Sequence, residues 1–86
     1  MDPQKLHESL AKLHQELERA PKVDAESRKL LLKLMADIGR LVGKPEAAAG
    51  THRPRLKELE AKFEADHPAL AATLREFIDL LAKAGL

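Results

Sequence analysis

Four histidines are the side chains of this sequence best suited to metal binding or general base catalysis: His7, His14, His52 and His67. On a helix, His7 and His14 would share a face but stand roughly 10 Å apart along the axis, too far to bind one metal ion. His14 and Glu18 have the i,i+4 spacing of paired ligands and could offer two ligands across a dimer. The simpler interpretation places them on a helix surface beside a row of leucines. We therefore expect no metal ion and no other cofactor.

Nucleophilic and phosphate-binding motifs are missing from the sequence. Ser9 and Ser27 are the only serines, and neither follows the nucleophile-elbow pattern. The glycines do not have the spacing of a P-loop or of a dinucleotide-binding turn. Because there is no cysteine, a thiolate nucleophile and a disulfide framework are also excluded. The sequence predicts a protein without enzymatic activity.

Length and charge narrow the class of protein further. The 86 residues suffice for one small domain, and 15 basic against 14 acidic side chains are too balanced for a general nucleic-acid binder. No apolar run reaches the roughly 18 residues of a membrane span, and the N-terminal MDPQKLHESL lacks the apolar segment of a signal peptide. These features predict a cytoplasmic domain that does not contact a membrane.

The most apolar stretch, Leu30 to Val42, has helical periodicity. Its apolar face is roughly 140° wide, more than one partner helix can cover, so at least two neighbouring helices are implied. A second broad apolar face follows the proline at position 68. The residues expected to form the core are Leu30, Leu31, Leu34, Met35, Ile38 and Leu41 of the first stretch and Leu70, Leu74, Phe77 and Leu81 of the second. We expect these two helices to meet at the centre, with two narrower helices outside.

Prolines, glycines and capping residues divide the chain into four helices. Asp24 is expected to cap the second helix, and Asp66 or His67 the fourth, which would begin at Pro68. The sequence thus predicts an all-α, bundle-like domain over residues 1–86, with two antiparallel helical hairpins (1–43 and 54–86) and a linker over 44–53. Alternatively, the third and fourth helices form one bent helix. Because so short a chain is expected to leave its wide apolar faces partly uncovered, dimerisation would complete the bundle.

A second stripe on the central helix consists mainly of small residues: Leu32, Ala36, Gly39 and Gly43. Gly39 costs about 1 kcal/mol relative to alanine inside a helix, so it requires a reason. The stripe could pack closely against a helix of the same chain, or it could be the contact between two copies. The third alternative is that Gly39 is an accidental surface glycine.

Basic residues on or just after the central helix suggest an alternative function. They are Arg28, Lys29, Lys33, Arg40, Lys44, Arg53 and Arg55. A local basic patch of this kind could bind nucleic acid, although no aromatic side chains are interleaved to stack on bases. The main interpretation remains a non-enzymatic helical interaction or oligomerisation module, with a homodimer as the expected assembly and a further protein partner left open.

Three segments carry a resemblance to a known family: LHQELE (Leu13 to Glu18), VDAESRKLL (Val23 to Leu31) and the ending from FEADHPALAATL to LLAKAGL. They resemble the bacterial family DUF4404, a domain of unknown function. The most specific match is a Glu-x-x-His-Pro-Ala-Leu block, here Glu64, His67, Pro68, Ala69 and Leu70. Pro21 and Lys22 depart from the more usual polar turn. The resemblance implies a bacterial, cytoplasmic, all-helical protein, and it brings no established activity or functional residues.

Overall fold

The computed structural model describes residues 3–41 and 52–83, and these form helices without any strand. The helices are α1 (Pro3–Glu18), α2 (Ala25–Leu41), α3 (Arg53–Glu64) and α4 (Pro68–Lys83). α3 therefore begins at the last residue of the expected linker. α3 and α4 are two helices and not one bent helix, because His67 precedes a proline and is disfavoured in the α conformation.

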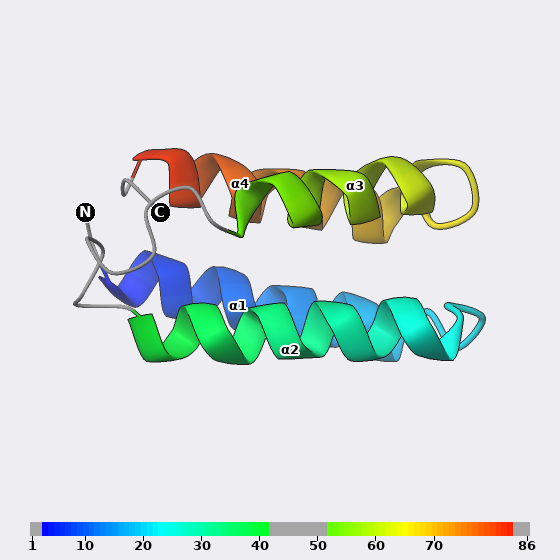
Figure 1. Cartoon of the computed structure of the whole chain (residues 1–86), viewed down its shortest axis with the longest axis horizontal. Helices are drawn as coiled ribbons and strands as arrows, with labels where there is room; N and C mark the ends of the chain where they lie inside the picture. Colours follow the sequence, from blue (N-terminus) through cyan, green and yellow to red (C-terminus); the bar gives the residue numbers. More distant parts are fainter. Residues whose placement is uncertain (1–2, 42–51, 84–86) are drawn as a thin grey trace.

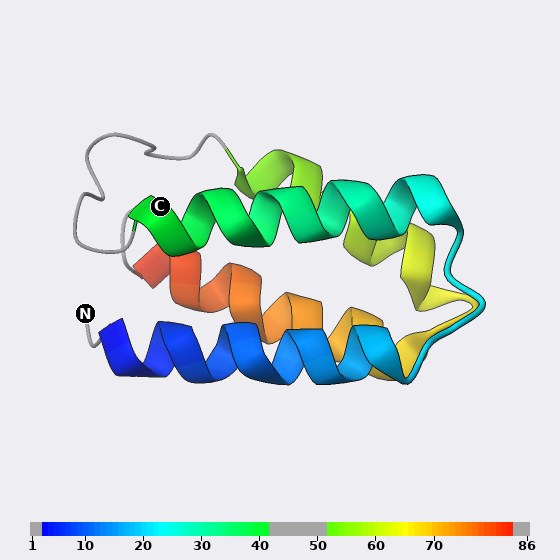
Figure 2. The same ribbon diagram turned by 90° about the horizontal axis from the view of Figure 1, so that it is seen from below.

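The four helices lie in two layers, with α1 and α2 in one and α3 and α4 in the other (Figure 1). Seen from below, α3 runs behind α2, and α4 runs obliquely behind the space between α1 and α2 (Figure 2). The most extensive contacts join α4 to α3 and α4 to α1, whereas α2 contacts α1 and α3 more sparsely. α2 and α4 stand diagonally and meet through side chains at the centre of the core, whereas the two narrower helices, which were expected outside, lie between them. The wide apolar faces of α2 and α4 each pack against two neighbouring helices, α1 and α3.

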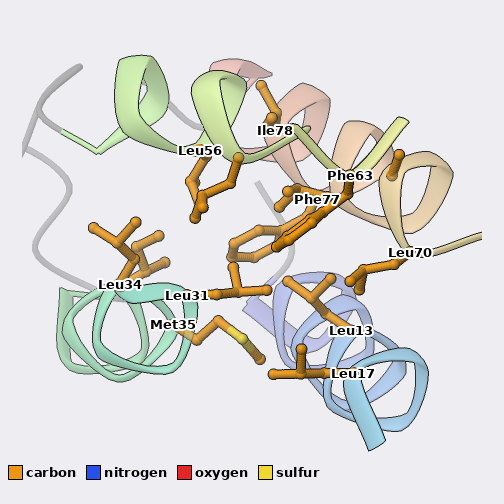
Figure 3. Packing of buried hydrophobic residues seen from close by; sticks show 14 of the residues in the cluster. Leu13, Leu17, Leu31, Leu34, Met35, Leu56, Phe63, Leu70, Phe77 and Ile78 are labelled. Atoms are coloured by element: carbon orange, nitrogen blue, oxygen red, sulfur yellow. The ribbon is translucent and has the colours of Figure 1, made fainter. Parts of the chain in front are cut away.

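Side chains from all four helices converge on one core, in which Phe77 of α4 and Leu31 of α2 point toward one another (Figure 3). Eight of the residues expected in the core are buried: Leu31, Leu34, Met35, Ile38, Leu70, Leu74, Phe77 and Leu81. Leu30 was predicted to lie in the core, and this prediction was wrong, because Leu30 is only partly buried. It lies at the edge of the α2 face and lines depressions between α2 and α3. The side chain of Leu41 lies outside the described residues.

The apolar face of α2 is covered by the chain itself. Among the described residues, Leu32 is the exposed large hydrophobic side chain, with 37% of its surface accessible. The reasoning that 86 residues would leave the wide faces uncovered was therefore wrong. The rows of buried leucines on α1 and α3 supply the missing cover, although each row is narrow. Any contact between two copies must use other residues.

Local hydrogen bonds position the ends of the helices. Asp24 Oδ2 accepts a hydrogen bond from the backbone N–H of Ser27 at 3.1 Å and so caps α2. At the start of α4, the carbonyl of His67 accepts the bond from Ala71, which makes His67 the N-cap residue, whereas Asp66 is exposed in the turn. The His67 ring also packs edge-on against Phe63, with 6.2 Å between ring centroids. Pro68 follows at the first helical position, where its missing N–H costs nothing.

Candidate functional site

A polar cluster ties the N-terminus of α2 to α3. Lys62 Nζ donates a hydrogen bond to Ser27 Oγ at 2.6 Å and lies 3.2 Å from Asp24 Oδ1. Ser27 is buried, with 3% of its surface accessible, and both Ser27 and Lys62 line a depression of about 250 Å³ between α2 and α3. Sequence reasoning missed this cluster, because 35 residues separate Lys62 from Ser27 and only the packing of the helices brings them together.

The Ser27–Lys62 pair has the composition of a nucleophile and its base, but its surroundings favour a structural role. A lysine activates a serine only when it is neutral and can accept the hydroxyl proton. Lys62 is 56% exposed and is paired with the Asp24 carboxylate, so water and Asp24 both stabilise its positive charge. Lys62 therefore donates to Ser27 and holds α3 against α2.

The same cluster changes the titration of Asp24. The backbone N–H of Ser27, the Ser27 hydroxyl and the Lys62 ammonium, in that order, hold the pKa of the Asp24 carboxyl below its ordinary value near 3.8. Folding thus favours the ionised form. The stability that Asp24 contributes is present above the pKa of the unfolded chain, and it is lost as the pH falls through the lower pKa of the folded chain.

Replacing Asp24 by asparagine is expected to flatten the acid limb of the stability profile. The amide oxygen can still accept the Ser27 hydrogen bond, but it does not titrate and does not attract Lys62. Melting temperatures measured by circular dichroism should fall more steeply for the unmodified protein than for Asp24→Asn below about pH 4. Asp66→Asn, at an exposed turn position, is the control. Parallel profiles for the unmodified protein and Asp24→Asn would contradict the assignment.

The stripe of small residues on α2 does not lie on one surface. Leu32 and Ala36 are exposed, whereas Gly39 is partly buried beside α1. A Cβ built at Gly39 would lie 4.0 Å from Leu10 Cδ1, which is ordinary van der Waals contact. α1 therefore does not approach closely enough at this point to require glycine. Gly43, the fourth member of the stripe, lies outside the described residues.

Gly39→Ala is accordingly expected to stabilise the protein. The methyl group fits beside Leu10, and alanine is favoured over glycine by about 1 kcal/mol inside a helix. Urea denaturation should show a midpoint shifted to higher concentration with an unchanged slope. A loss of stability would mean that α1 and α2 approach one another more closely in solution than in this structure.

The histidines occupy separate places. His7 and His14 are exposed on α1, as is Glu18. Within residues 3–41 and 52–83, no group of three or more histidine, cysteine, aspartate or glutamate side chains is arranged to hold a metal ion. His52 is less exposed than these residues: 14% of its side chain is accessible, and its Nε2 lies 3.9 Å from Asp37 Oδ2.

The basic residues do not form one patch. Arg28 turns inward and donates hydrogen bonds to the carbonyls of Leu17 and Ala20. Arg40 is paired with Asp37. Lys29, Lys33 and Arg55 are exposed on α2 and α3, Arg53 is partly buried, and Lys44 lies outside the described part of the chain. Of the residues proposed for nucleic-acid binding, Lys29, Lys33 and Arg40 are thus exposed on one side of α2, whereas Arg28 bonds to the end of α1.

The described residues define a small all-helical protein whose polar clusters join helices to one another. No helix among them is long and apolar enough to span a membrane. Comparison with family models gives one match, to the domain of unknown function DUF4404 over residues 6–86, and the chain belongs to that family. The resemblance read from the sequence is thereby confirmed. Comparisons with curated proteins and with solved structures gave no significant match.

Proposed function

We propose that this protein is a non-enzymatic helical module that associates with a second copy of itself. The observation that supports the proposal is the exposure of Leu32 and Ala36, one turn apart on α2, in a chain whose other large apolar side chains are buried or partly buried where the structure describes them. Together the two side chains offer a second copy an apolar contact in the middle of α2. The cytoplasm is the proposed setting, which a cysteine-free composition suits.

The proposed contact is the α1–α2 surface, defined here as His7, Ala11, His14 and Glu18 of α1 with Leu32 and Ala36 of α2. All six are exposed. Their position follows from Leu10 and Gly39, which face one another at the boundary between the two helices. His7 and His14 stand three and four residues from Leu10, and Ala36 stands three from Gly39, so they border this boundary on its outer side. Apart from Glu18, the surface carries small, apolar or uncharged groups.

Size and charge favour a second copy as the occupant. α1 and α2 lie side by side along one face of a molecule that measures 34 × 21 × 18 Å between Cα atoms, so a second copy of equal length could lie along both helices. The outer side of α2 carries exposed Lys29 and Arg40, whereas the outer side of α1 carries Glu18. A two-fold arrangement that lays α1 of one copy on α2 of the other therefore brings opposite charges together.

Sedimentation across a concentration range tests the proposal. The unmodified chain is expected to show the mass of two chains at tens of micromolar, and Leu32→Glu to shift the dissociation constant upward by at least about tenfold, because a carboxylate would be buried at the contact. Ala72→Glu, at an exposed position of α4, adds the same charge in the other layer and should leave the assembly unchanged. A mass of one chain throughout the range would overturn the proposal.

Charge reversal tests the orientation of the two copies. Glu18→Lys and Lys29→Glu should each weaken association, and the double variant should recover part of the loss. If Lys29→Glu alone strengthened association, α2 would lie on α2 of the other copy, since that arrangement places like charges together.

A further inference from the structure

The boundary between α2 and α3 contains two depressions that share Leu30 and Arg55 but differ in charge. The depression of about 250 Å³ beside Ser27 is lined by both Glu26 and Glu58, together with Lys62 and Arg55. The other, of about 240 Å³, has Lys33, His52 and Arg55 on its walls and a single carboxylate, that of Asp37; we call it the Lys33–Arg55 cavity. Only the second offers more basic than acidic groups.

Lys33 and Arg55 form no ion pair within the described part of the chain. Other cations on the same helices have partners: Arg40 pairs with Asp37, and Lys62 pairs with Asp24. Neither Lys33 nor Arg55 takes part in an ion pair or side-chain hydrogen bond with residues 3–41 or 52–83. They come from facing helices and line one cavity together with Leu30 and Leu34. Two like charges beside apolar side chains repel one another, and an anion between them would relieve that repulsion.

Asp37, the acidic residue that lines the Lys33–Arg55 cavity, already has partners. Asp37 Oδ1 accepts a hydrogen bond from Arg40 Nη2, and Asp37 Oδ2 lies 3.9 Å from His52 Nε2. Arg40 thus offsets the charge of this carboxylate from outside the cavity lining. His52 lies beside Asp37, with 14% of its side chain accessible, and its ring lines a third side of the cavity.

We propose that the Lys33–Arg55 cavity binds a small phosphate monoester. Arginine presents a planar pair of N–H donors that matches two phosphate oxygens, and lysine supplies a compact positive charge from the other side. The volume of about 240 Å³ exceeds that of a bare phosphate and lies below that of drug-sized sites, which fits a phosphate carrying a short organic group. The cavity lies on the edge of α2 away from the α1–α2 surface, so the two proposals stand independently.

Amide chemical-shift titration of the full chain at constant ionic strength is the test, with glycerol 3-phosphate, inorganic phosphate, glycerol and chloride as probes. Glycerol 3-phosphate is expected to cause saturable shifts in the millimolar range at Lys33, Asp37, His52 and Arg55. Inorganic phosphate should act at the same residues more weakly, and glycerol and chloride should have no such effect. Equal shifts with chloride, or phosphate-induced shifts elsewhere only, would overturn the proposal.

Two variants and a matched control locate the site. Arg55→Gln and Lys33→Gln should each weaken glycerol 3-phosphate binding by about tenfold or more, the loss expected from a charge-assisted hydrogen bond. Both side chains are exposed, so the melting temperature should change little. Lys57→Gln removes the same charge from the opposite side of α3 and should bind as the unmodified protein does. An equal loss in Lys57→Gln would overturn the proposal in favour of general charge attraction.

Binding of a short single-stranded oligonucleotide tests whether the cavity takes a small phosphate monoester or belongs to a nucleic-acid surface. We expect it to bind no more tightly per phosphate than glycerol 3-phosphate does. Tight, steeply salt-dependent binding, with shifts that spread to Lys29 and Arg40, would overturn the small-ligand proposal and support the basic residues of α2 as a nucleic-acid surface instead.

Discussion

Replacing Phe77 by alanine is expected to lower the free energy of unfolding by about 3–5 kcal/mol, the usual cost of removing a buried phenylalanine ring. Phe77 has no accessible surface and stands in the middle of α4, the helix with the most extensive contacts to its neighbours. Its ring reaches across to Leu31 of α2, so the cavity left by alanine would loosen three helices at once (Figure 3). In a domain whose total stability is of the order of 5–15 kcal/mol, such a loss removes a large share of the free energy of unfolding.

Urea denaturation followed by circular dichroism measures this loss. Leu80→Ala is the matched control, because Leu80 lies on the same helix but is only partly buried. It should cost well under half as much, since less apolar surface is removed from the core. Similar losses in both variants would mean that the diagonal contact between α2 and α4 contributes little to stability.

The positions of the helices could be predicted from the sequence, because capping residues, prolines and the spacing of apolar residues determine them. Asp24 caps α2 through its own side chain, and Pro68 begins α4 because the residue before it avoids the α conformation. Leu31, Leu34, Met35 and Ile38 repeat at helical spacing, and the structure buries all four. Interactions within a few residues of one another leave a direct trace in the sequence.

The arrangement of the helices was not accessible in the same way. A wide apolar face shows that a helix has two neighbours, but the face does not identify them. This is why the two narrower helices were expected outside the core, and why Leu30 was assigned to the core although it lies at the rim of the face. Pairs such as Lys12–Glu76, 64 residues apart, depend on the same long-range arrangement.

The candidate site residues were predicted least well from the sequence. Helical spacing places a residue on one side of its helix, but it does not show which residues of other helices lie opposite. Gly39 and Leu32 belong to one stripe by spacing, yet Gly39 lies beside α1 and Leu32 is exposed. Lys33 and Arg55 were grouped with five other basic residues, and only the structure shows that these two line one cavity. Which side chains can act together in this protein therefore depends on which sides of two helices pack against one another.

Arg28 supplies the second large effect, since Arg28→Ala is expected to cost about 1–3 kcal/mol, far more than most changes at partly exposed positions. Its guanidinium donates hydrogen bonds to the carbonyl of Ala20 at 2.9 Å and to that of Leu17 at 3.4 Å. These carbonyls end α1 and its turn, and the positive charge also interacts favourably with the C-terminal end of the helix dipole. Without Arg28, the end of α1 and its turn lose these two hydrogen bonds, whereas the Asp24 cap at the start of α2 remains.

Lys29→Ala is the control for Arg28→Ala, because it removes the same charge from the adjacent, outward-facing position and should change stability by less than about 0.5 kcal/mol. Arg28→Lys should fall between the two, since an ammonium keeps the charge near the helix end but cannot reach two carbonyls in the geometry of a guanidinium. Thermal and urea denaturation of the three variants gives this order directly. If Arg28→Ala were no less stable than Lys29→Ala, Arg28 would be a solvated basic residue like its neighbour, and its place in the basic patch would have to be restored.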